Sequence, residues 1–60
     1  MENEASQALI ERAMNSDNCS VAYMLIDAAK RLNSKLDTVS IKQAWLNQAM
    51  EKQFQAMKGQ

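Results

Sequence analysis

The last third of the chain, DTVSIKQAWLNQAMEKQFQAMK (residues 37–58), decides the fold because it reads as one long helix. Asp37 is a good N-cap residue, since its carboxylate can accept a hydrogen bond from an N–H group of the first turn. Glutamine, alanine, lysine and methionine dominate the stretch, and all four favour helices. We therefore predict a helix over residues 38–58, about 30 Å long, with Gly59 as its C-terminal stop.

This helix carries two apolar stripes on nearly opposite sides. The first stripe contains Ile41, Ala44, Trp45, Ala49 and Ala56. The second contains Val39, Leu46, Met50, Phe54 and Met57. A helix that packs on one neighbour needs one stripe, so two stripes predict two contacts. Trp45 is expected in the core, and the second stripe is covered either by the other helices of the chain or by a partner.

Two polar clusters, at residues 15–18 and 33–35, divide the rest of the chain into helices expected at about 3–15 and 18–33. Asp17 or Ser20 is the expected cap of the second helix. Its expected buried stripe has helical spacing and consists of Val21, Leu25, Ala28 and Leu32. The sequence thus predicts an all-α fold, a single three-helix domain over residues 1–60 with a long C-terminal helix. It leaves open whether this domain is a monomer or a dimer.

The composition argues against chemistry performed by this chain. Sixty residues include one cysteine, Cys19, and no histidine, which excludes an intrachain disulfide, the usual zinc patterns and a Cys–His nucleophile. The carboxylates are scattered and no glycine-rich loop is present, so we expect no enzyme activity, catalytic residue, cofactor, metal or small-molecule substrate.

The chain is also expected to lie outside membranes and in the cytoplasm. Its longest apolar run, residues 21–26, is far shorter than the roughly 20 residues that a membrane span requires. A single unpaired cysteine fits a reducing compartment.

The zero net charge hides an asymmetry between the two halves. Residues 1–29 hold five acidic residues and one arginine, a net charge of −4, whereas residues 30–60 hold six basic and two acidic residues, a net charge of +4. Either the two halves fold back on each other, or copies of the chain pair antiparallel, or the basic half meets an acidic partner.

We therefore expect a small helical protein–protein interaction module: an accessory regulator, inhibitor or adaptor that docks with itself or another protein. The expected anchors on the second stripe are Leu46, Met50, Phe54 and Met57, with Lys42, Lys52 and Lys58 steering an acidic partner. Tyr23 and Ile26 lie away from the expected buried stripe of the second helix and form a candidate contact patch.

The alternative is a DNA-binding regulator. Residues 28–47 resemble a helix-turn-helix, with paired alanines, a short polar turn without glycine, and Thr-Val-Ser opening the second helix. Bases would be contacted by Ser40, Lys42, Gln43 and Asn47, and phosphates by Lys30, Arg31 and Lys35.

Overall fold

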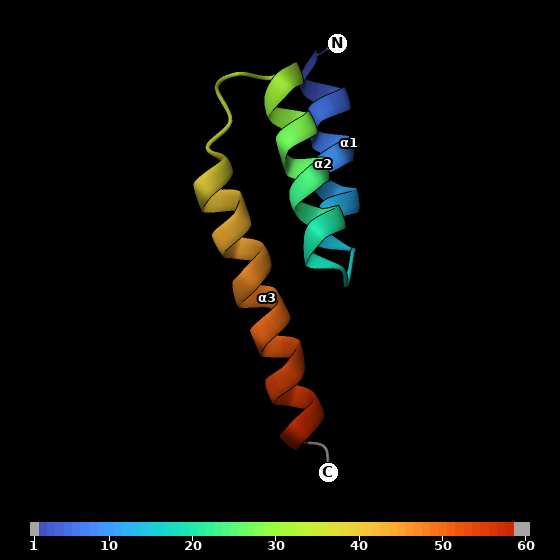
Figure 1. Cartoon of the computed structure of the whole chain (residues 1–60), viewed down its shortest axis with the longest axis vertical. Coiled ribbons are helices and arrows are strands. Elements are labelled where there is room, and N and C mark those ends of the chain that lie inside the picture. The colour runs from blue at the N-terminus through green and yellow to red at the C-terminus, as the bar shows by residue number, and fades with distance from the viewer. Residues whose placement is uncertain (1, 59–60) are drawn as a thin grey trace.

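Three helices make up the computed structural model, which describes residues 2–58. They are α1 (Glu2–Met14), α2 (Cys19–Leu32) and α3 (Thr38–Lys58). The first two form an antiparallel hairpin, and α3 lies beside α2 and runs on past the end of the hairpin (Figure 1). The predicted all-helical, three-helix fold is confirmed, with bounds that differ by one residue at both ends of α1 and α2. Gly59, the expected stop, lies outside the described residues.

Side chains that cap helix N-termini fix where α2 and α3 begin. Asp37 caps α3 as predicted, because its Oδ1 accepts a hydrogen bond from the N–H of Ser40 at 3.2 Å and its Oδ2 accepts one from Ser40 Oγ at 2.8 Å. The cap of α2 is Asn18, whose Oδ1 accepts a hydrogen bond from the N–H of Val21 at 3.1 Å. The expectation of Asp17 or Ser20 was wrong because Asn18 holds the extended backbone that aims a side chain at the first turn.

Small residues bring α1 and α2 close together. Ser6 and Ala13 of α1, and Ala22 and Ala29 of α2, are at most 1% exposed. Alanine and serine let two helix backbones approach closely, so their burial marks the side on which α1 and α2 pack together.

The face of α2 that is buried is therefore not the one that was predicted. Ala22, Ile26 and Ala29 are fully buried, whereas Val21 and Leu32 from the expected stripe are each 42% exposed. The close approach of α1 selects the side of α2 that carries Ala22, Ile26 and Ala29 and leaves Val21 and Leu32 exposed.

Trp45 holds α3 on the hairpin. Among the side chains of α3 that the structure describes, Trp45 is the one that is buried. Its ring packs edge-to-face against Tyr23, with ring centroids 6.2 Å apart at an angle of 77°. Its indole Nε1–H donates a hydrogen bond to the carbonyl oxygen of Ser16 at 3.0 Å. Ile41 and Ala49, one turn away on either side, pack against the same core. The first stripe thus faces the core through Trp45, as expected.

The last part of α3 projects beyond the hairpin. The described chain has a radius of gyration of 12.7 Å, whereas a compact domain of this length would have about 10 Å. Every residue from Met50 to Lys58 is exposed. The reason is length, because α3 has 21 residues whereas α1 has 13 and α2 has 14.

Replacing Trp45 by alanine should abolish the fold. Truncating a buried tryptophan costs about 3–5 kcal/mol, and the core of a domain this small rarely supplies more than about 3–5 kcal/mol in total. We expect Trp45→Ala to lose most helical circular dichroism at 25 °C. Met50→Ala is the control, because Met50 is 60% exposed and should change the free energy of unfolding by less than about 0.5 kcal/mol. If both variants had the melting temperature of the wild type, this packing would be contradicted.

The cap of α3 should make stability depend on pH. The hydrogen bonds from Ser40 lower the pKa of Asp37 from its ordinary 3.8, with further lowering by the positive charge of Lys30. A carboxyl whose pKa is lowered by folding stabilises the fold above its unfolded pKa, and that contribution disappears as pH falls through the folded pKa. Asp37→Asn keeps a capping side chain without the charge. We expect the melting-temperature difference between wild type and Asp37→Asn to be constant above about pH 5 and to close below pH 3.8. A difference that stays unchanged down to pH 2 would contradict the role of the charge.

Candidate interaction surface

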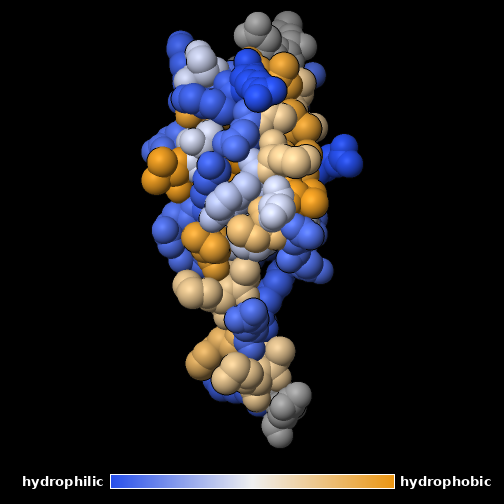
Figure 2. Space-filling model, in the orientation of Figure 1, coloured by the Kyte–Doolittle hydropathy of each residue, from blue (hydrophilic) through white to orange (hydrophobic). Residues whose placement is uncertain are grey.

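A row of apolar side chains on α3 remains uncovered. We call it the α3 stripe. Its members and their exposed fractions are Val39 76%, Leu46 37%, Met50 60%, Phe54 64% and Met57 73%. The row runs along the side of α3 that Trp45 does not use, and it continues onto the projecting end. Figure 2 shows hydrophobic side chains on this narrow lower end of the molecule. The hairpin therefore covers one of the two stripes on α3 and leaves the other exposed.

The lysines expected to steer an acidic partner have different roles in the structure. Lys42 Nζ lies 3.2 Å from Asp27 Oδ1, and Lys52 Nζ lies 3.9 Å from Asp17 Oδ1. Both ion pairs join the basic half of the chain to the acidic half, as expected if the halves fold back on each other. Lys58 instead sits at the projecting end, with its Nζ 5.9 Å from the centroid of the Phe54 ring. Of the three, Lys58 is the one placed beside the end of the α3 stripe.

The contact patch expected on α2 is not a surface patch. Ile26 is fully buried, and Tyr23 is half-buried between Trp45 and Lys42, whose Nζ lies 5.0 Å above the tyrosine ring. Both residues belong to the seam between the hairpin and α3, so the expectation that they face a partner was wrong. The error follows from the misplaced buried stripe of α2, because rotating that helix exchanges its core and surface sides.

A second, smaller apolar area lies on α2. Val21 and Leu32 are 42% exposed and Met24 is 68% exposed. Sequence reasoning missed this area because the same helical spacing was interpreted as the core side. The sequence did contain a sign of the buried side, since Ala22 and Ala29 lie two helical turns apart on the side that packs on α1.

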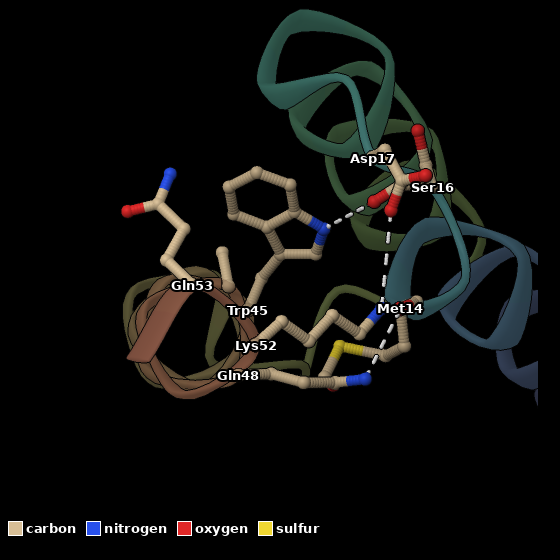
Figure 3. A pocket seen from close by; sticks show the side chains of 8 residues that line it. Met14, Ser16, Asp17, Trp45, Gln48, Lys52 and Gln53 are labelled. Carbon is tan, nitrogen blue, oxygen red and sulfur yellow. Dashed lines mark hydrogen bonds and ion pairs between the residues drawn. The ribbon is translucent and has the colours of Figure 1, made fainter. Parts of the chain in front are cut away.

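A shallow groove lies where α3 meets the turn between α1 and α2 (Figure 3). Across it, Trp45 donates its hydrogen bond to Ser16, Lys52 approaches Asp17, and Gln48 Nε2 donates a hydrogen bond to the carbonyl oxygen of Met14 at 3.5 Å. The groove encloses about 200 Å³, less than the roughly 300–1,000 Å³ of typical ligand pockets. Because its polar groups contact one another, we assign it to holding α3 in place.

The candidate DNA-binding residues are mostly engaged within the chain. Lys30 Nζ donates hydrogen bonds to the carbonyl oxygens of Ser34 and Leu36 at 2.5 and 2.7 Å. Gln43 Nε2 donates a hydrogen bond to Asn47 Oδ1 at 3.1 Å. Ser40 donates a hydrogen bond to Asp37, and Lys42 forms its ion pair with Asp27. Arg31 and Lys35, by contrast, are exposed.

The arrangement of α2 and α3 also departs from a helix-turn-helix. In that motif two helices cross at about 90–120° after a turn of three or four residues. Here five residues, 33–37, separate the helices, which run in nearly opposite directions side by side (Figure 1). At the N-terminal end of α3, where base contacts were expected, Ser40 and Gln43 are exposed, whereas Lys42 is held by Asp27.

Cys19 is exposed at the first position of α2. Within the described part of the chain, no group of three or more cysteines and acidic residues is placed to hold a metal ion. None of the helices over residues 2–58 has both the length and the apolar character to cross a bilayer.

Comparison of the sequence with protein-family models and with curated proteins, and of the structure with solved structures, finds no match.

Proposed function

We propose that this chain is a small helical protein–protein interaction module, an accessory regulator, inhibitor or adaptor that docks through the α3 stripe. The observation that carries the proposal is the exposure of that stripe on a helix whose opposite side is held by Trp45. The proposal assigns the chain no catalytic step. The exposed, unpaired Cys19 fits action in a reducing compartment such as the cytoplasm.

The size of the stripe supports this proposal. A large side chain exposes about 150–200 Å² when nothing covers it, so the measured fractions leave on the order of 500 Å² exposed. The largest apolar patch on a typical monomer measures about 300–600 Å² and is often functional. The stripe makes up about a tenth of the accessible surface of 4730 Å².

The shape of the stripe supports docking into or along another helical surface. Leu46, Met50, Phe54 and Met57 follow one another by about one turn each, which is the spacing with which amphipathic helices anchor in grooves. Two of the four are methionines, whose flexible side chains adapt to the surface they meet. On the projecting end, Phe54 and Met57 have no hairpin beside them, so a partner would have access to much of the helix there.

Site-specific photo-crosslinking tests the proposal. A benzophenone amino acid at Phe54 sits on the stripe, and the matched control at Gln55 sits one residue away on the polar side of the same exposed turn. In cell lysate, we expect protein adducts from position 54 and at least tenfold less adduct from position 55. Equal adduct yields at both positions, or none at either, would contradict docking through the α3 stripe. The mass of the adduct separates a second copy of the chain from a different protein.

A further inference from the structure

We infer that the α3 stripe is covered by the α3 stripe of a second copy of the chain, the two helices packing antiparallel about a twofold axis level with Gln48. This inference rests on the proposed function, because it names the partner of the same surface. Three observations favour a second copy: the symmetry of the stripe, the distribution of charge along α3, and the area available.

All members of the stripe except Phe54 have the same pattern in both directions. Around Gln48, Leu46 and Met50 lie two residues away on either side, and Val39 and Met57 lie nine residues away. Between these pairs, five residues from Gln48, two exposed glutamines complete the row. In a twofold interface, when residue i of one copy contacts residue j of the other, residue j of the first also contacts residue i of the second, so the surface must be complementary to itself. An antiparallel pair would match apolar with apolar at positions 39, 46, 50 and 57, and glutamine with glutamine at positions 43 and 53.

The spacing of the row is that of a coiled-coil seam. The positions 39, 43, 46, 50, 53 and 57 alternate steps of four and three residues, which is the repeat that lets two helices interlock side by side. Phe54 flanks the seam and would lie at the level of Ser40 and Lys42 of the second copy. The projecting end of one chain would thereby pack against the first turns of the other chain's α3. The exposed side chains of the projecting end would then be buried.

Charges permit this pairing. Lys42 and Lys52 are already neutralised by Asp27 and Asp17 of their own chain. The described charges that remain on α3 are Glu51 and Lys58, which cancel. The antiparallel arrangement sets Lys58 of each chain level with Asp37 of the other, and places each helix N-terminus near a C-terminus of opposite partial charge. The chain as a whole has zero net charge, so two copies approach without long-range repulsion.

The buried area fits a weak dimer. About 500 Å² from each copy gives a total of about 1,000 Å², which is the lower limit for a specific interface. The dimer should therefore dissociate on dilution, in contrast to obligate dimers, which bury 2,000 Å² or more.

Solution mass measured against concentration tests the dimer. By light scattering after gel filtration at roughly 10 μM to 1 mM, we expect the mass of the wild type to rise from 6.8 kDa toward twice that value. Met50→Glu places two charges beside the axis and should stay a monomer throughout. Met24→Glu is the matched control, because Met24 is as exposed as Met50 but lies on α2, and it should behave as wild type. Circular dichroism confirms that both variants remain helical.

Disulfide trapping tests the antiparallel register. In a Cys19→Ser background, which removes the natural thiol, Val39→Cys and Met57→Cys proteins are prepared separately and then mixed under mild oxidation. The proposed register brings position 39 of one chain beside position 57 of the other, within the 4.4–6.8 Å Cα separation of a disulfide. We expect the mixture to give at least tenfold more crosslinked dimer than either protein alone.

Each failure has a distinct meaning. A folded wild-type monomer at every concentration, or equal dissociation of the Met24→Glu and Met50→Glu variants, overturns the dimer. Crosslinking of each cysteine variant with itself overturns the antiparallel register in favour of a parallel one. If the dimer fails while photo-crosslinking at position 54 captures a different protein, the proposed function stands without this inference. If the wild type stays a monomer at every concentration and position 54 gives no adduct, both fail together.

Discussion

The packing of Trp45 against the hairpin is the contact on which the rest of the structure depends. Its ring meets Tyr23 and its Nε1–H reaches the Ser16 carbonyl oxygen at the turn between α1 and α2. One side chain thus binds α3 to α2 by apolar contact and to the turn between α1 and α2 by a directional hydrogen bond. Because Trp45 orients α3, it also decides that the α3 stripe points away from the other helices.

The small side chains between α1 and α2 have a consequence of their own. Alanine and serine give a close contact, but Val21, Met24 and Leu32 of α2 remain exposed. Ile26 is the largest fully buried side chain, so the core beneath Trp45 is modest. Apolar side chains that a larger domain would bury remain outside on both α2 and α3. A chain with so small a core gains stability from any partner that binds its folded form, which links its architecture to the proposed docking.

The charge asymmetry between the halves serves the same arrangement. Asp17 and Asp27 lie on the hairpin and meet Lys52 and Lys42 on α3, so opposite charges reinforce the position that Trp45 sets. These pairs are partly or largely exposed, and such pairs contribute only about 0–1 kcal/mol each. Their greater effect is on the surface, because they leave α3 without excess charge next to its apolar stripe.

The sequence by itself determined the three helices, their approximate ends, the Asp37 cap and the two stripes of α3. These features are local, since helix propensity, capping and side-chain period depend on neighbours within about one turn. Only the tertiary structure decided which stripe each helix buries. On α2, the Val21–Leu32 side and the Ala22–Ala29 side both have helical period. The Val21–Leu32 side stays exposed because the alanine side allows α1 to approach closely. On α3, the exposure of the second stripe followed from the position of Trp45 and from the length of the hairpin, neither of which is a local property of the sequence.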